Sequence, residues 1–305
     1  MAGVGAAAAI LGLRILLVGI ERVLLRRLGE HGAPTECAAA FFAIGALILL
    51  PFAGLGHPRD WSYLRLAIPS GLVYAVAYWF YVSALVGGDV TAVAPLGATG
   101  SLFVVLLAAL LHGEPLSLAK MGGAVLIAGG SALLQRRQPG AERAPPGRHR
   151  PRVSPSAAQM LAYAGLTAIT RMLDKANAVA AGSAPAGTYG FTVFAVVALC
   201  EGGLLLVSGG LGRLPRLLLR QPVVALAAGA CNGGSFLLLL LALTRVPVSV
   251  AEPVTAVSLL VTAALAAAWF REPVGARWLP TLAVVGGTWL LVSGGAVPAG
   301  LMLPG

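Results

Sequence analysis

Apolar runs of about 20 residues follow one another along almost the whole chain, separated by short polar turns. A run of this length matches a helix that crosses the hydrocarbon core of a bilayer. The pattern predicts an all-α polytopic membrane protein with ten transmembrane helices. Their approximate ranges are 3–25, 34–55, 64–86, 90–111, 116–134, 157–179, 185–207, 222–243, 248–270 and 276–294.

Two stretches of the chain repeat each other at an offset of 158 residues, namely 90–134 and 248–292. Pro95 and Pro253 occupy equivalent positions, and each lies 19 residues before a glutamate that is followed by proline. Since each copy carries five helices, an odd number, the second copy must cross the membrane in the opposite sense. The sequence therefore predicts two inverted five-helix repeats, with a substrate site between them near mid-membrane.

The segment 135–156 interrupts the apolar pattern with six arginines and five prolines. Such a composition is typical of a flexible linker. The predicted organisation is therefore a first repeat at residues 1–134, a basic proline-rich linker at 135–156 and a second repeat at 157–305.

Composition supports the membrane class and argues against several others. The chain is 58% hydrophobic and only 10% charged, with a mean hydropathy of +0.88, whereas soluble domains carry roughly 25% charged residues. Its net charge of +10 falls mainly in short loops and the linker, so we expect the lipid bilayer and not nucleic acid as the partner. Heavy Ala, Gly and Arg use with only two lysines suggests a high-GC bacterium.

Enzymatic chemistry has little support in the sequence. The four histidines fall in predicted loops, and the three cysteines are far apart in apolar runs, so no metal spacing is present. Phosphate-cradling glycine loops and nucleophile elbows are absent. We expect no catalytic residues, no metal and no cofactor.

Orientation follows from the distribution of Lys and Arg in short loops. Most arginines fall on the side that holds the linker and the loop at 209–221, which predicts a cytoplasmic location for that side and external termini. The basic side carries the six linker arginines together with Arg22, Arg26, Arg27, Arg213, Arg216, Arg220, Arg271 and Arg277, and the other side carries Arg59, Arg65, Lys120 and Arg245.

The repeated unit resembles the EamA unit of the drug/metabolite transporter superfamily. Its features are a valine five residues before a proline, an apolar helix, a Glu-Pro turn and a glycine-rich helix. The carriers are Val90, Pro95, Glu114, Pro115, Gly122, Gly123, Gly129 and Gly130 in the first copy, and Val248, Pro253, Glu272, Pro273, Gly286 and Gly287 in the second.

This resemblance implies a ten-helix inner-membrane transporter with a central cavity, and it implies no particular substrate. It also implies cytoplasmic termini, in contrast to the arginine count. The Glu-Pro turns are expected to be structural, and the glycine pairs to let helices approach closely.

Charged side chains inside the predicted spans are candidates for function, because burying a charge in lipid costs about 2.5–3.5 kcal/mol on insertion scales. Arg14 sits mid-helix and could anchor an anionic or carboxylate-bearing substrate, or form a structural ion pair. Arg171, Asp174 and Lys175 share one face of the sixth helix, where Arg171 could bind substrate or mark an early helix end.

Four carboxylates are candidates for proton coupling: Glu21, Asp174, Glu201 and Glu252. Each could exchange a proton within reach of the cavity, or could instead pair with an arginine. Glu252 precedes Pro253, and its repeat-mate is Ala94. This asymmetry favours a substrate role, although a helix N-terminus would also stabilise its charge.

Aromatic and amide side chains complete the predicted site. Tyr74, Tyr78 and Tyr81 fall on one face of the third helix, and Asn232 is the repeat-mate of Tyr74. Tyr74, Tyr78 and Asn232 are therefore predicted to line the cavity, with core packing as the alternative.

These patterns favour a secondary transporter, in the direction of export, that moves a small polar metabolite or drug by alternating access, with proton coupling as an option. A lipid-linked substrate flippase and a non-transporting membrane subunit are the alternatives. The protein is expected to act as a monomer or homodimer on a small-molecule substrate.

Overall fold

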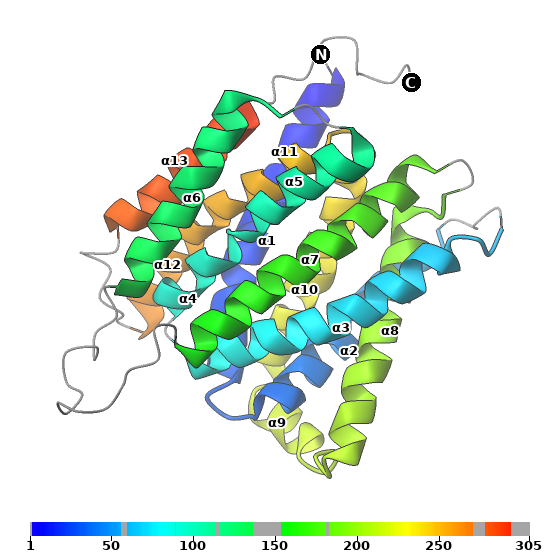
Figure 1. Cartoon of the computed structure of the whole chain (residues 1–305). Coiled ribbons are helices and arrows are strands. Elements are labelled where there is room, and N and C mark those ends of the chain that lie inside the picture. Colours follow the sequence, from blue (N-terminus) through cyan, green and yellow to red (C-terminus); the bar gives the residue numbers. More distant parts are fainter. Residues whose placement is uncertain are drawn as a thin grey trace.

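Every regular element in the part of the chain that the structure describes is a helix (Figure 1). The computed structural model describes residues 2–55, 60–88, 90–113, 116–136, 154–180, 183–270 and 278–293. The predicted all-α class is confirmed. Most of the linker, Glu114-Pro115 and Glu272-Pro273 lie outside the described residues.

The helices of the first half end just before the linker, and those of the second half begin just after it. The first half contains α1 (Ala2–Leu28), α2 (Pro34–Ala53), α3 (Leu64–Gly87), α4 (Val90–Gly97), α5 (Gly100–His112) and α6 (Leu118–Arg136). The second half contains α7 (Pro155–Val179), α8 (Ala186–Val207), α9 (Leu214–Arg220), α10 (Pro222–Leu243), α11 (Val248–Val254), the 3-10 turn η1 (Thr255–Val257), α12 (Ser258–Phe270) and α13 (Trp278–Ser293).

Six segments are long and apolar enough to cross a bilayer by length and composition. They are Pro34–Ala53, Leu64–Gly87, Val93–His112, Ala186–Val207, Pro222–Leu243 and Val248–Trp269. Two shorter apolar stretches lie in α6 and α13. The chain is therefore a multi-pass membrane protein. Helices α1 and α7, which carry charged side chains in their middle turns, are not among the six.

Two predicted helices are interrupted where continuous helices were expected. The 90–111 segment breaks between α4 and α5 at Ala98–Thr99, and the 248–270 segment passes through η1. Both breaks lie shortly after a proline, Pro95 in one and Pro253 in the other, and they correspond at the offset of 158 residues. Proline removes a backbone donor and clashes with the turn before it, so it weakens the helix in both copies close to these breaks.

The packing pairs repeat between the two halves. Helix α3 packs on α7 as α1 packs on α10, and α5 packs on α7 as α12 packs on α1. Likewise α8 packs on α3 as α2 packs on α10, while α2 pairs with α8 and α6 pairs with α13. Exchanging each helix with its counterpart in the other half therefore preserves the contacts.

The first turn of α1 lies at the end of the molecule opposite α9 (Figure 1). The segment 209–221, predicted as a loop, contains the short helix α9. Arg213, next to this helix, pairs with Glu36 at the start of α2, with 3.0 Å between Nε and Oε1. At the far end of α2, the Ser62 hydroxyl and amide donate to Asp60 and hold the pKa of that carboxyl below its ordinary value.

Glycine lets α6 and α13 approach closely, as the sequence suggests. A Cβ at Gly287 would lie 2.5 Å from the Gly123 carbonyl oxygen, and one at Gly130 would lie 2.8 Å from the Pro280 carbonyl oxygen. By contrast, Gly122 and Gly286 have open space where a Cβ would stand. Only some of the predicted packing glycines therefore meet a neighbouring helix.

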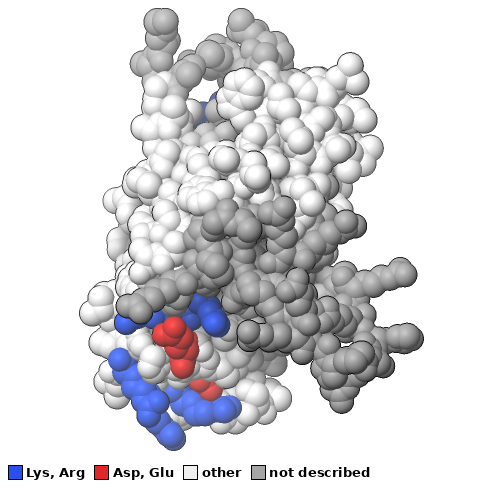
Figure 2. All heavy atoms as spheres, turned by 90° about the vertical axis from the view of Figure 1, so that its left-hand side faces the viewer, with Lys and Arg blue, Asp and Glu red and all other residues white. Residues whose placement is uncertain are grey.

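The outer faces of α6 and α13 carry exposed apolar side chains, including Met121, Val125 and Leu282. In the view from this side, the charged side chains that are drawn gather towards one end, and most of the remaining described surface is uncharged (Figure 2). A broad uncharged surface on a polytopic protein suits contact with lipid hydrocarbon.

Candidate functional site

The two helix breaks position a polar cavity in the centre of the molecule. Non-helical backbone at membrane depth is tolerated where it is buried in protein or lines a polar cavity. Here Gly97 and Ala98 from the first break face the same cavity as Thr255 and Ala256 from the second. These two pairs are repeat-mates at the offset of 158 residues.

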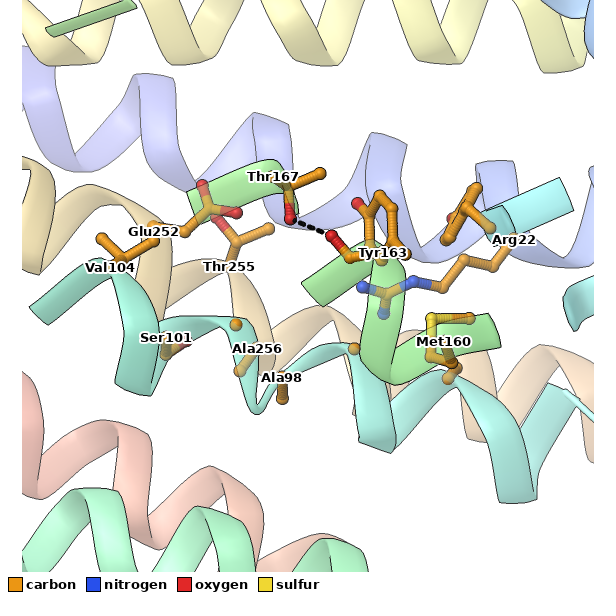
Figure 3. A pocket seen from close by; sticks show the side chains of 14 residues that line it. Arg22, Ala98, Ser101, Val104, Met160, Tyr163, Thr167, Glu252, Thr255 and Ala256 are labelled. Carbon is orange, nitrogen blue, oxygen red and sulfur yellow. Dashed lines mark hydrogen bonds between the residues drawn. The ribbon is translucent and has the colours of Figure 1, made fainter. Parts of the chain in front are cut away.

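Two adjoining cavities, each with a volume of about 40 Å³, occupy this centre. The first lies between the two broken helices, α1, α3 and α7 (Figure 3). The second lies deeper, among α1, α3, α7, α10 and α11. Both are lined by Arg22, Tyr81, Tyr163, Glu252 and Thr255.

The cavities in this conformation are too small to hold a metabolite. One water needs roughly 10–15 Å³ of such space, so each cavity has room for about three waters. The polar side chains have closed around the site. A larger molecule could enter only if the surrounding helices move apart.

Glu252 is the centre of the polar contacts. Its Oε2 atom lies 2.9 Å from Arg171 Nε and 3.2 Å from Arg14 Nη2. Arg14 also donates to the Thr255 hydroxyl. The side chains of Arg14 and Arg171 are 5% and 3% exposed, and that of Glu252 is 19% exposed. The carboxylate is thus the most accessible member of the group, and it joins α1 to α7 through α11.

Asp174 holds Arg171 from behind. Its Oδ2 atom accepts from Arg171 Nη1 at 3.2 Å and from the Tyr74 hydroxyl at 3.2 Å. Its Oδ1 atom accepts from Ser70 at 3.0 Å and from Tyr189 at 3.2 Å. The Arg171 guanidinium also lies 5.4 Å from the centre of the Tyr74 ring, within cation–π range. Asp174 and the Tyr74 ring therefore hold Arg171, and Asp174 is itself held by Ser70, Tyr74 and Tyr189.

Glu21 and a group of tyrosines line the deeper cavity. The Tyr81 hydroxyl donates to Glu21 Oε1 at 3.2 Å, and the Ser235 hydroxyl donates to Glu21 Oε2 at 3.5 Å. The Tyr78 ring centre lies 5.3 Å from those of Tyr81 and Tyr163, and the Tyr81 and Tyr163 centres are 4.7 Å apart. This group offers an aromatic surface beside the charged one.

Arg22 does not lie at the membrane surface, where the sequence analysis places it. Helix α1 continues to Leu28, so Arg22 lies almost two turns inside it. Its Nη1 atom donates to Ser258 Oγ at 3.0 Å, and the side chain lines both cavities. Its guanidinium lies beside Tyr163 (Figure 3). The expected surface role applies only to the arginines further along α1.

The structure brings five of the predicted site residues to the cavities: Arg14, Glu21, Tyr78, Arg171 and Glu252. Tyr74 and Asp174 lie behind them, bonded to each other. Neither residue lines a cavity, and the Tyr74 hydroxyl is committed to Asp174.

Two further predicted residues lie elsewhere. Asn232 and Glu201 are both buried, but neither lines either cavity. Among the described atoms, Glu201 Oε2 and Asn232 Nδ2 have no hydrogen-bond partner. Their burial places them in the helix packing around α8 and α10.

Several residues that line the cavities were not predicted from the sequence. They are uncharged, and the residues that they contact are distant in the sequence. Tyr163 and Thr167 lie two turns and one turn before Arg171, on the same face of α7. Continuing the charged face of α7 towards its N-terminus could have identified both. Thr255 and Ser258 carry no such signal, because serine and threonine are common throughout the apolar helices.

The described residues contain no group of three or more His, Cys, Asp or Glu side chains that could hold a metal ion. What the arrangement can do is bind a charged group. Three arginines, two carboxylates and several tyrosines surround a small polar space.

Comparison with known proteins identifies the first half of the chain. Residues 5–136 match the model of the EamA-like transporter family. No curated protein matches the sequence. Among solved structures, one chain, described only as a protein crystal structure, superposes with a TM-score of 0.64 at 21% identity. The match covers 93% of this chain and 95% of that one, so the likeness extends over both halves as a fold.

Proposed function

We propose that this protein, whose residues 5–136 form an EamA-like transporter domain, is a secondary transporter that moves a small polar molecule across the membrane by alternating access. In this proposal the chain consists of ten spans in two inverted repeats, at residues 1–134 and 157–305, joined by the basic linker. The broken segments α4–α5 and α11–α12 each count as one span. The repeated packing pairs support this arrangement.

The observation that carries the proposal is the pair of cavities between the halves. Charged side chains from α1, α7 and α11 meet there at two helix breaks. In inverted-repeat transporters, substrate sites lie at the repeat interface and use interrupted helices. Because the cavities are closed in this conformation, transport requires rocking of one half against the other, with Arg14, Arg171 and Glu252 as the substrate contacts.

We assign proton coupling to the carboxylates that line the cavities. Glu21 and Glu252 line the cavities, whereas Asp174 is committed to holding Arg171 and Glu201 lies outside. Glu252 and Glu21 are therefore the proposed proton carriers. Export across a bacterial inner membrane is the proposed direction, with one of these carboxylates changing its protonation as the solute moves.

The test is uptake into proteoliposomes that contain the purified full chain. A panel of amino acids, sugars, carboxylates and drugs is supplied with and without an imposed pH gradient, and protein-free liposomes serve as controls. Saturable uptake of at least one compound, accelerated by the gradient, is expected. Uptake equal to that of the protein-free liposomes for the whole panel would contradict the proposal.

A lipid-linked substrate flippase gives a different result in the same liposomes. It would move a fluorescent lipid-linked substrate between the leaflets without any response to the pH gradient.

A further inference from the structure

We infer that Glu252 occupies, in the closed protein, the position of a substrate carboxylate. The transported molecule is then a small carboxylate with an apolar or aromatic body, and it displaces Glu252 from Arg14 and Arg171. This inference rests on the proposed transport function and adds the chemical class of the solute and the event that opens the site.

The first argument is that, in the described part of the chain, the two arginines are held by further side chains, whereas Glu252 is not. Arg171 is held by Asp174 and by the Tyr74 ring, and Arg14 is held by Thr255. Among the described residues Glu252 forms ion pairs only with these two arginines, and it is the most exposed of the three side chains. Both of its contacts run to the single atom Oε2. The arginines therefore form a built anion site, and the carboxylate is the member that can leave.

The second argument is that two arginine N–H groups around the deeper cavity are without an acceptor in the described part of the chain. Arg14 Nε and Arg22 Nε are buried N–H groups with no acceptor among the described atoms. Both side chains line the deeper cavity. A buried donor without a partner is costly, so an entering carboxylate that reaches Arg14 Nε would satisfy a donor that Glu252 leaves open. Guanidinium groups suit carboxylates because they can bind both oxygens.

The third argument concerns the rest of the solute. Tyr78, Tyr81, Tyr163 and Phe236 line the cavities beside the arginines. Their rings offer an apolar wall to the part of the molecule that is not charged. This combination favours an aromatic or short aliphatic acid over a sugar or a polyamine.

Charge balance gives the exchange a measurable consequence. When all are ionised, Arg14, Arg22 and Arg171 balance Glu21, Asp174 and Glu252. An entering anion adds one negative charge, and Glu252 at the same moment loses both arginines. An unpaired carboxylate in this buried site is costly, so Glu252 takes up a proton from water as the solute binds. One proton is bound for each anion, and the cluster stays neutral.

Several charged groups surround Glu252 in the described part of the chain. Glu21 and Arg22 line the same cavity from α1, and Lys120 of α6 donates to Ser249, one turn before Glu252, at 3.4 Å. Arg14 faces it from α1, and Arg171 faces it from α7 with Tyr163 beside it and Asp174 behind. Helices α5 and α10 contribute only uncharged side chains to the cavities, namely Ser101, Val104, Ser235 and Phe236. The described part of α13 contains no ionisable side chain.

The test measures binding to the purified full chain in lipid nanodiscs, with three probes that differ in one group: benzoate, benzylamine and benzyl alcohol. Isothermal titration between pH 6 and pH 8 gives the affinity, and benzoate stays ionised throughout. The variants are Glu252→Gln, which removes the competing charge, and Glu36→Gln. The latter is the matched control, because Glu36 is another buried carboxylate paired with an arginine and lines neither cavity.

Wild type and Glu36→Gln are expected to bind benzoate about tenfold more tightly for each unit by which the pH falls, since one proton is taken up. Glu252→Gln should bind benzoate at least tenfold more tightly than wild type at pH 8, with no dependence on pH. Benzylamine and benzyl alcohol should bind none of the three proteins in the same range.

Preference for benzylamine would overturn the inference, and so would equal benzoate affinity and equal pH slope in wild type and Glu252→Gln. Absence of benzoate binding to a folded Glu252→Gln protein would also overturn it. If that variant does not fold, a flat pH dependence in wild type has the same meaning. Benzoate binding without transport of any panel compound would instead contradict the transporter function, whereas transport restricted to cations would contradict only the carboxylate site.

Discussion

At the scale of single residues, the molecule depends on one carboxylate that bridges two arginines. Glu252 meets Arg14 and Arg171 through Oε2, and each arginine has a second partner of its own. Removing a partner from a buried ion pair leaves an uncompensated charge, which typically costs 3–5 kcal/mol. The cost should therefore depend on how many charges each substitution leaves unpaired.

Glu252→Ala should destabilise the protein more than Arg14→Ala. The first change deprives both arginines of their shared partner, and about 3 kcal/mol or more is expected. The second leaves Glu252 bound to Arg171, so a smaller loss is expected. Thermal unfolding of the two purified variants in the same detergent measures the difference. A larger loss of melting temperature for Arg14→Ala would contradict the central place of Glu252.

Arg22 gives a second prediction at this scale. Arg22→Met should reduce uptake of an identified substrate at least tenfold, which corresponds to about 1.4 kcal/mol, because its guanidinium lines both cavities. Arg27→Met is the matched control, since Arg27 lies 5.1 Å from the Trp269 ring centre and lines neither cavity. Initial uptake rates at equal protein content distinguish the two positions. Equal uptake rates for the two variants would mean that Arg22 has no role at the cavities.

At the scale of helices, the prolines create the irregular backbone that the cavity needs. The breaks after Pro95 and Pro253 bring backbone turns from both halves to the same space. Thr255 and Glu252 owe their positions to the second break.

Pro253→Ala should let α11 continue into α12 and thereby reduce transport about tenfold or more. Alanine restores the missing N–H and favours a helix by roughly 3 kcal/mol over proline, so the fold should tolerate the change. Pro222→Ala is the control, because Pro222 opens α10, where proline is already compatible with the helix. The measurement is uptake rate together with melting temperature. Unchanged uptake in Pro253→Ala would mean that transport does not require the helix break after this proline.

Two adjacent glycines test the packing of α6 on α13. Gly287→Ala would place a methyl group 2.5 Å from the Gly123 carbonyl oxygen, and overpacking of this kind typically costs 1–3 kcal/mol. Gly286→Ala meets nothing within 4 Å and should leave stability unchanged or slightly raised. Melting temperatures of the two variants decide the matter, and equal values would mean that this helix pair can separate without cost.

The sequence predicts the helices well and their mutual contacts poorly. Apolar runs locate the spans because lipid imposes their length and polarity, and charges within α1 and α7 identify Arg14 and Arg171. The Arg14–Glu252 pair joins residues 238 positions apart, and no local pattern encodes it. Arg22 was misplaced because the end of α1 was predicted at Leu25, three residues early, and Tyr74 binds Asp174 instead of facing the cavity.

At the scale of the whole molecule, the two halves enclose a site that neither could form alone. Arg14, Arg22 and Tyr81 belong to the first half, and Tyr163, Arg171 and Glu252 belong to the second. The closed cavities hold only a few waters, so a transporter must pass through states in which this centre opens to each side in turn. Ala256 lies at the second break and lines the first cavity, which makes it a suitable reporter of that opening.

The most direct test is thiol labelling of Ala256→Cys in a chain whose Cys37, Cys200 and Cys231 are replaced by serine. A membrane-impermeant methanethiosulfonate reagent is applied to sealed right-side-out and inside-out vesicles, with Ala266→Cys, buried and outside both cavities, as the control. Alternating access predicts that Ala256→Cys is modified from both sides and Ala266→Cys from neither. Modification of Ala256→Cys from one side only, or from neither, would contradict it.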